Sequence, residues 1–291
     1  MTGVDQLFLD HVAVVVPDLA RAGKAYERLG FWLTPQSSHK GPLKPGGPLE
    51  PFGSGNHCAM FTEGYLELLG ITDPHRYTGE VTPQLQRYAG LHLVALGCRD
   101  ARQAARELGR RLGAELGVRE LGRDVPQAEG GTKPAVFRIV GLPAGAFPEA
   151  KLFLIEHATP EVLWQPALLE QPNGVTGLEG AVLCVTSPAE TRRRLSRILD
   201  REDAGGRFTL ARGTIEVIDR QEFAARYGGE PRALPMVAAA RFTVSDTAAT
   251  ARDLRGKGVP LRESGGRIWI GPETAEGAIL EFVPPSAGGR R

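Results

Sequence analysis

The sequence predicts an α+β protein in which four β-α-β-β-β modules pair into two curved mixed sheets with the helices outside. Three observations support this fold. Four segments share one order: an apolar strand, a short turn with Asp, Ser or Pro, an amphipathic helix, and further strands. The sequences Glu63-Gly64 and Arg212-Gly213 indicate tight hairpin turns. One module has an apolar sheet face that it cannot cover alone, so modules are expected to pair.

The elements follow in the same order in each module. In the first, a strand from residue 7 precedes a helix that Asp18 opens and Gly30 ends. In the second, a strand from residue 91 precedes a helix that Asp100 caps. The third and fourth modules repeat this order. The strands expected after the helices are 58–62, 65–71, 136–140, 151–155, 208–211, 214–218, 267–270 and 278–283.

The modules divide the chain into two predicted domains. We expect residues 1–160 to form an N-terminal domain with two modules and the candidate cleft, and residues 178–291 to form a C-terminal domain with two degenerate modules. Residues 161–177 contain Trp164, Pro166, Pro172, Asn173 and Gly174, and this composition indicates a connector. The Gly/Pro-rich residues 41–55 are predicted to form a long loop, and such loops often form the rim of a site.

Composition excludes several classes of protein. The 291 residues are 42% hydrophobic, which is enough for a sizeable core. Basic residues number 35 and acidic residues 34, so the chain lacks the basic excess of a nucleic-acid binder, and the Arg192-Arg193-Arg194 run is expected to be a solvated helix face. No apolar run approaches a membrane span, and no leader is visible. We expect a soluble cytoplasmic protein whose partner is a small molecule.

The three cysteines are far apart, and each lies in an apolar stretch. No CxxC sequence occurs. This pattern disfavours a disulfide framework or a thiolate zinc site and predicts buried, inert thiols.

Several motifs resemble the vicinal-oxygen-chelate superfamily, which contains the glyoxalases, the bleomycin-resistance proteins and the extradiol dioxygenases. Within it, the chain is most similar to the glyoxalase-like domain proteins. The resemblance is specific over residues 7–175, weaker beyond, and implies a fold and a metal position rather than one reaction. The sequences that carry it are Leu9-Asp-His11-Val, Val16-Pro-Asp18-Leu, Leu29-Gly-Phe31, Gly55-Asn56-His57, Gly64-Tyr-Leu-Glu67-Leu, His157 to Trp164, and Gln171-Pro-Asn-Gly174.

The resemblance implies a metal site. In the superfamily, the ligands come from the first and last strands of two paired modules, and His11, Glu67 and His92 match those positions. Two imidazoles and one carboxylate suit a divalent ion such as Fe, Mn, Zn or Ni, and leave positions open for two vicinal oxygens of a substrate. Glu67 and His57 are the candidate catalytic residues.

The strand register of the second module conflicts with this ligand set. His11 precedes the helix-opening Asp18 by seven residues, whereas His92 precedes Asp100 by eight. Strict alternation therefore places His92 on the opposite face, unless a bulge lies between it and Asp100. Gly97 is the position where we expect such a bulge.

The fourth ligand position is open to two interpretations. Phe153 occupies the slot that Glu67 fills in the first module, and His157 shares the face of Phe153 by alternation. Either His157 joins the site, or the fourth ligand is water or substrate.

Ordinary structural roles explain the same residues without a metal. His11 is then a hydrogen-bonded structural histidine, Glu67 lies on a solvated face, His57 caps a turn, and His157 caps the helix that begins at Pro160. His39 and His75 lie in polar loops and are expected to have plain surface roles.

Three functions remain open. The first is a metal-dependent enzyme of lyase or isomerase type that acts on a small oxygenated metabolite, with the metal as Lewis acid. The second is a metal-free protein that binds or sequesters a small molecule, like the bleomycin-resistance proteins. The third is a structural or interaction module. No histidine follows His157, so we do not expect an extradiol dioxygenase of the usual plan. The C-terminal modules then cover the first pair or support a homodimer.

Overall fold

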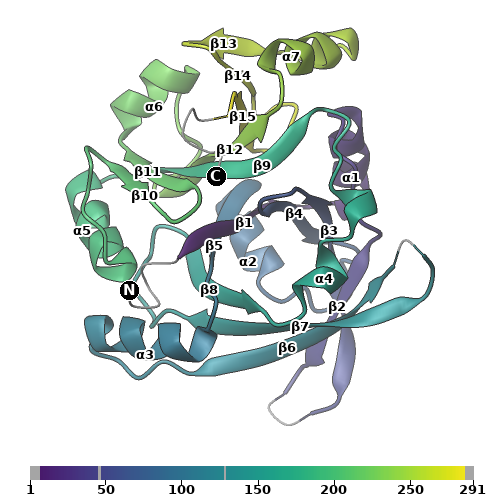
Figure 1. Ribbon diagram of the computed structural model, residues 1–291, viewed down its shortest axis with the longest axis vertical. Helices are drawn as coiled ribbons and strands as arrows, with labels where there is room; N and C mark the ends of the chain where they lie inside the picture. Colours follow the sequence, from purple (N-terminus) through teal and green to yellow (C-terminus); the bar gives the residue numbers. More distant parts are fainter. Residues whose placement is uncertain (1–6, 45–46, 128, 286–291) are drawn as a thin grey trace. The chain divides into compact units, whose positions relative to one another are not determined.

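The computed structural model describes residues 7–44, 47–127 and 129–285 (Figure 1). These residues form two compact units. Unit 1 comprises residues 7–12, 93–165 and 178–241, and unit 2 comprises residues 13–92, 166–177 and 242–285. The boundary runs within four strands, so each unit combines segments from both halves of the chain. The predicted connector at residues 161–177 stays a prediction.

The strands form two curved mixed sheets, as the sequence predicts. Among the described residues, one sheet has the order β2-β3-β4-β1-β5-β8-β7-β6 and the other has the order β10-β11-β9-β12-β15-β14-β13. The strands that contribute to both units are β1 (Phe8–Val16), β5 (Gly90–Gly97), β9 (Val175–Cys184) and β12 (Met236–Val244).

The second module lies mainly in unit 1. Its elements are α3 (Ala101–Leu112), β6 (Val118–Pro126), β7 (Thr132–Gly141) and β8 (Lys151–His157). The Asp100 carboxylate caps α3 by accepting from the Gln103 amide at 2.9 Å, as expected, and Gly113 ends the helix with φ 68°. β8 pairs in parallel with β5 and antiparallel with β7.

The bulge expected at Gly97 is absent from the ladder between β5 and β8. Pairing there is continuous from Leu93, opposite Lys151, to Gly97, opposite Ile155. Gly97 has a different role, because a Cβ at this position would lie 2.0 Å from the ring of Phe8. The glycine therefore makes room for an aromatic side chain.

The third module also lies mainly in unit 1, with α5 (Pro188–Leu199), β10 (Arg207–Thr209), β11 (Thr214–Ile218) and α6 (Arg220–Tyr227). The expected hairpin at Arg212-Gly213 joins β10 to β11. The C-terminal ends of α3 and α5 contact each other. Arg111 donates to the Ile198 carbonyl at 2.9 Å, and Arg197 donates to the Arg111 carbonyl at 2.6 Å. Each arginine thus satisfies a carbonyl near the end of the other helix.

The first module lies mainly in unit 2, with α1 (Leu19–Arg28), β2 (Ser37–Pro42), β3 (Leu49–Met60), β4 (Tyr65–Ile71) and α2 (Val81–Arg87). The Asp18 carboxylate caps α1, and Glu63-Gly64 forms the predicted turn between β3 and β4. β4 has the predicted bounds.

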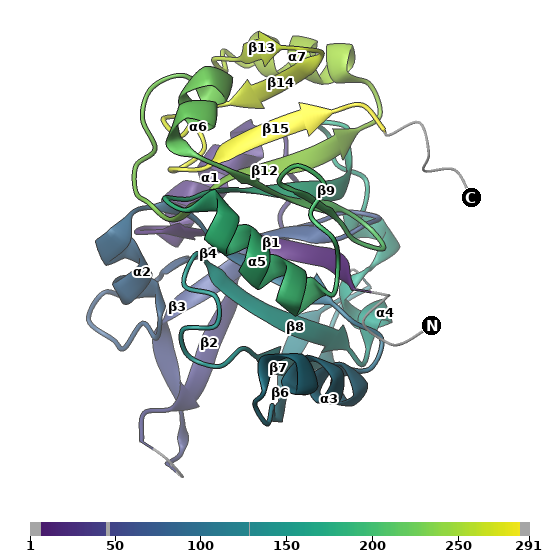
Figure 2. The same cartoon turned by 90° about the vertical axis from the view of Figure 1, so that its left-hand side faces the viewer.

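The prediction of a long loop at residues 41–55 is wrong for most of that stretch. β2 and β3 pair antiparallel there, with Lys40 opposite Pro51 and Pro42 opposite Leu49, and extend as a ribbon (Figure 2). The outer part of the ribbon is largely exposed, so it lacks the apolar alternation by which strands are recognised. Residues 45–46 lie outside the described residues.

The fourth module completes unit 2 with α7 (Thr247–Gly256), β13 (Arg262–Ser264), β14 (Arg267–Ile270) and β15 (Ile279–Val283). The core of this unit is aromatic. The Phe242 ring lies 6.0 Å from Phe31, 5.6 Å from Phe61 and 6.1 Å from Phe282. Rings at these separations stabilise a core beyond the area that they bury.

Two short helices follow β8: α4 (Pro160–Leu163) in unit 1 and η2 (Pro166–Leu168) in unit 2. No helix in the described parts of the chain has the length and apolar character needed to cross a bilayer. All three cysteines are buried, as predicted. Burial raises the pKa of both Cys98 and Cys184 to about 12, which keeps these thiols protonated and unreactive.

Candidate functional site

A buried carboxylate in unit 1 binds two of the predicted site histidines. Asp10 and His11 are neighbours on β1, and His157 is the last residue of β8. Nδ1 of His11 lies 2.7 Å from Oδ1 of Asp10. Nε2 of His157 lies 3.1 Å from each carboxylate oxygen. The structure therefore brings His157 to the same cluster as His11. Thr159, rather than His157, takes the N-cap position of α4.

Aromatic rings surround the two imidazoles. The Phe153 ring meets His11 edge-on at 5.8 Å, so the residue in the slot equivalent to Glu67 packs on the first-strand histidine. The Trp164 and Phe137 rings meet His157 edge-on at 4.8 and 5.4 Å. This environment limits the rotation of both histidines.

Burial alone would raise the pKa of Asp10. The charge of His157 and the hydrogen bonds from His11 and His157 outweigh burial, and hold the pKa of this carboxyl well below its usual range. Asp10 is therefore an anion that accepts hydrogen bonds from both rings.

Glu67 lies on β4 in unit 2 and is half-buried. Its Oε1 accepts a hydrogen bond from Nδ2 of Asn56, on β3, at 2.5 Å. Asn56 is itself buried. The amide therefore fixes one carboxylate oxygen of Glu67.

His57 lies next to Asn56 and is half-buried in unit 2. Its Nδ1 donates to the Thr34 carbonyl at 2.7 Å, and its ring faces Gly23 of α1. The ring thus ties β3 to the segment that follows α1. Its expected contact with a substrate stays a prediction.

His92 is buried near the start of β5 in unit 2. Its Nε2 donates to the Tyr88 carbonyl at 2.7 Å, and its ring stacks on the Tyr88 ring at 3.9 Å. Burial lowers the pKa of His92 and keeps the ring neutral. Nδ1 is the nitrogen of this ring that carries the lone pair.

Each predicted ligand is therefore held by a partner within its own unit. His11 donates to a carboxylate, His92 donates to a carbonyl, and Glu67 accepts from an amide. Metal-binding side chains are commonly oriented by such partners, so the donor chemistry of these residues fits a divalent ion. Among the described residues, no group of three or more His, Cys, Asp or Glu side chains is arranged to hold a metal.

Sequence reasoning missed Asp10. Adjacent residues of a strand point to opposite faces, so alternation separates Asp10 from His11. The signal that was available is the Asp-His pair itself, because two neighbouring polar residues are unusual within an otherwise apolar strand.

The remaining two histidines, His39 and His75, lie in unit 2. His75 is exposed, as expected for a surface residue. His39 is half-buried, and its Nδ1 lies 3.0 Å from the Ser54 hydroxyl oxygen.

The carboxylates of the last two modules bind arginines. Glu216, on β11, receives two hydrogen bonds from Arg226 at 2.6 and 2.9 Å and one from Arg241 at 3.1 Å. Glu281, on β15, is fully buried and accepts from Arg267 at 3.2 Å. Guanidinium groups therefore neutralise the carboxylates that occupy the positions equivalent to Glu67.

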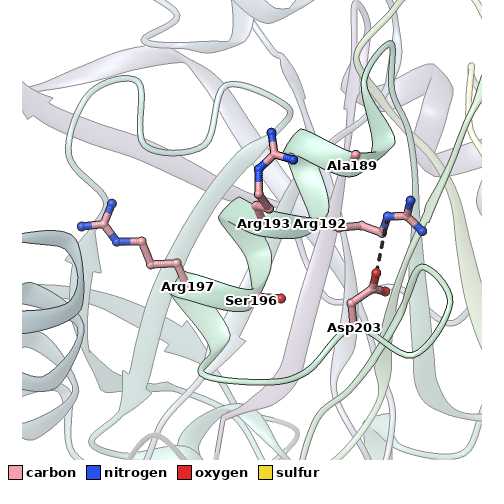
Figure 3. Close-up of a pocket in the computed structure, with 6 residues that line it drawn as sticks. All are labelled: Ala189, Arg192, Arg193, Ser196, Arg197 and Asp203. Carbon is pink, nitrogen blue, oxygen red and sulfur yellow. Dashed lines mark ion pairs between the residues drawn. The ribbon is translucent and has the colours of Figure 1, made fainter.

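A shallow groove lies along α5 in unit 1 (Figure 3). Arg192 forms an ion pair with Asp203 at 3.5 Å, while the side chains of Arg193 and Arg197 spread away from it along the helix. Arg194 instead binds the buried Glu149 at 2.6 Å. The groups do not converge on one point, which agrees with the solvated helix face expected for most of this run.

The modular fold, with its first-strand histidine, is that of the vicinal-oxygen-chelate superfamily. The sequence model of the glyoxalase-like domain family matches residues 9–199, and the chain belongs to this family. A search of curated proteins gave no significant match.

Solved structures share the fold over almost the whole chain. A hypothetical protein from Staphylococcus aureus is 13% identical, with a TM-score of 0.59, over 96% of this chain and 100% of that chain. A mutant of 4-hydroxymandelate synthase from Streptomyces coelicolor is 15% identical, with a TM-score of 0.56, over 95% and 92%. A fusion of a xylose isomerase-like TIM barrel with 4-hydroxyphenylpyruvate dioxygenase is 13% identical, with a TM-score of 0.57, over 98% and 50%. At these identities the similarity shows the fold alone.

Proposed function

We propose that the chain is a divalent-metal-dependent enzyme of lyase or isomerase type that acts on a small oxygenated metabolite. The observation that carries this proposal is the hydrogen bond from His11 Nδ1 to the buried Asp10 carboxylate. That bond places the ring proton on Nδ1, so Nε2 would be the nitrogen through which His11 binds a metal. Membership in the glyoxalase-like family also supports a metal ligand at the position of His11.

His11, Glu67 and His92 are the residues that we propose as ligands of the ion, although they do not form a ready ligand group among the described residues. Asn56 fixes one oxygen of Glu67, so the other oxygen would bind the metal. The hydrogen bond from His92 Nε2 to the Tyr88 carbonyl means that Nδ1 would be the metal-binding atom of His92. A bound ion would supply Lewis-acid stabilisation of negative charge on a substrate oxygen. His57 has its Nδ1 proton on the Thr34 carbonyl, so Nε2, which faces Gly23 of α1, is its accepting nitrogen.

Metal binding by the purified protein tests this proposal. Protein prepared without chelator should contain a divalent ion, measured by plasma mass spectrometry. His11→Ala and Glu67→Gln should each weaken rebinding of Mn²⁺ or Zn²⁺ by about 100-fold or more in titration calorimetry, because each substitution removes a proposed metal ligand rather than a residue that orients a ligand. His92→Ala should have a similar effect if Nδ1 binds the ion.

The matched control is His75→Ala, which removes an exposed imidazole and should leave affinity unchanged. Wild-type protein that binds no divalent ion, or His11→Ala protein that binds as tightly as wild type, would contradict the proposal.

A second candidate function is metal-free binding of a small molecule, like that of the bleomycin-resistance proteins. The aromatic rings of Phe153, Trp164 and Phe137 beside His11 and His157 favour it, since such rings bind planar or apolar ligands. Thermal-shift measurements separate the two functions. Stabilisation by a metal alone supports the enzyme, whereas stabilisation by aromatic ligands in the presence of chelator supports the binding protein.

A further inference from the structure

The Asp10 carboxylate joins two histidines that come from different strands of unit 1. Oδ1 lies 2.7 Å from Nδ1 of His11 and 3.1 Å from Nε2 of His157, and Oδ2 lies 3.1 Å from the same Nε2. An ionised carboxylate only accepts hydrogen bonds. Each ring must therefore carry a proton on the nitrogen that faces Asp10.

We propose that Asp10 is the positioning residue of this site, and that it fixes His11 in the Nδ1–H form and His157 in the Nε2–H form. Asp10 is 1% exposed, so water competes little for its oxygens. The rings of Phe153 and Trp164 pack edge-on against the two imidazoles and hold their planes. Only the consequence that His11 presents Nε2 to a metal rests on the proposed function.

The two bonds differ in a way that a single substitution can detect. Asp10→Asn keeps the shape of the side chain but replaces one accepting oxygen with a donating amide. The shorter bond to His11 should retain Oδ1 as the oxygen, so that the new amide takes the place of Oδ2 and His157 Nε2 keeps only its 3.1 Å contact to Oδ1. The amide N–H opposes a ring N–H that faces it. The Nε2–H form of His157 should therefore lose population to the Nδ1–H form, while His11 keeps its Nδ1–H form.

Nitrogen-15 NMR of the histidine side chains measures these forms directly in metal-free protein at pH 8. The signals are assigned with His11→Gln and His157→Gln. In wild type we expect Nδ1–H at His11 and Nε2–H at His157, and in Asp10→Asn a shift toward Nδ1–H at His157 only. The matched control is Asp100→Asn, at the exposed carboxylate that caps α3, which should change neither ring.

A wild-type His11 that carries its proton on Nε2 would overturn the proposal, and so would an unchanged His157 in Asp10→Asn. If Asp10→Asn does not fold, the forms found in wild type still decide the matter.

Calorimetric titration with Mn²⁺ supplies the second measurement. Asp10→Asn should weaken binding by about 10- to 100-fold, and Asp100→Asn should leave it unchanged. Wild-type protein with the expected ring forms but no affinity for Mn²⁺ would contradict the proposed function and leave the role of Asp10 intact. Equal affinity in wild type and Asp10→Asn would overturn the positioning role at the metal.

Discussion

Replacing Glu216 by Gln is expected to destabilise the protein by about 3 kcal/mol or more. Arg226 and Arg241 both bind this carboxylate, and the Arg241 side chain is only 7% exposed. Removal of the negative charge takes a charged partner from two guanidinium groups, one of them buried. Denaturant unfolding followed by circular dichroism measures the change.

The matched control is Glu120→Gln. Glu120 also binds an arginine, Arg138, but its side chain is 61% exposed, so we expect a loss below about 1 kcal/mol. Equal losses in the two variants would contradict the ion-pair explanation.

The same cluster predicts a dependence of stability on pH. Burial alone would raise the pKa of Glu216, but Arg226 and Arg241 outweigh it and lower the pKa from 4.5 to about 2. A carboxyl with a depressed pKa in the folded state stabilises that state above pH 4.5, and this contribution is lost as the pH falls through about 2. Between these values, wild type should lose more stability than Glu216→Gln.

Replacing Gly277 by Ala is expected to cost about 3 kcal/mol or more. Gly277 has φ 95°, and an added Cβ would lie 2.1 Å from the backbone oxygen of Ala89. The approach is reciprocal, since a Cβ at Gly90 would lie 2.5 Å from the Gly277 oxygen. Neither backbone has a flexible end that can move aside, so the clash adds to the strain of a positive φ. The shift of the urea midpoint measures this loss.

Gly265→Ala provides the control for Gly277→Ala. Gly265 also has a positive φ, of 58°, but open space surrounds its Cβ position. The Gly265→Ala variant should lose only about 1 kcal/mol of stability, which is the cost of placing a side chain at a positive φ. A comparable loss at Gly277 would show that the backbone contact matters little. A larger loss in Gly277→Ala would indicate that the clash also disturbs the start of β5, because Ala89 and Gly90 lie between Tyr88 and His92.

The parts of the fold that the sequence predicts are those with local signals. β4 has its predicted bounds because a tight turn precedes it and apolar residues fill it. α3 begins after its predicted cap at Asp100 because Asp side chains favour that position. By contrast, β2 and β6 are polar and largely exposed, and only their pairing with β3 and β7 makes them strands.

The candidate site is less predictable for a related reason. His11 and Glu67 stand out as polar residues within apolar strands. The link between Asp10 and His157 joins positions 147 residues apart, and neither strand pattern nor spacing encodes it. The stacking of His92 on Tyr88 depends on the turn between α2 and β5, which hydrophobic periodicity does not describe.

The passage of four strands from one compact unit to the other has a consequence for synthesis on the ribosome. Unit 1 needs residues up to 241 and unit 2 needs residues beyond 242, while each also needs residues near the start of the chain. Unit 1 therefore cannot be completed before β12 is made, and unit 2 cannot be completed before β15 is made. The N-terminal segments must wait for partners made much later, so contacts of long sequence separation should make folding slow.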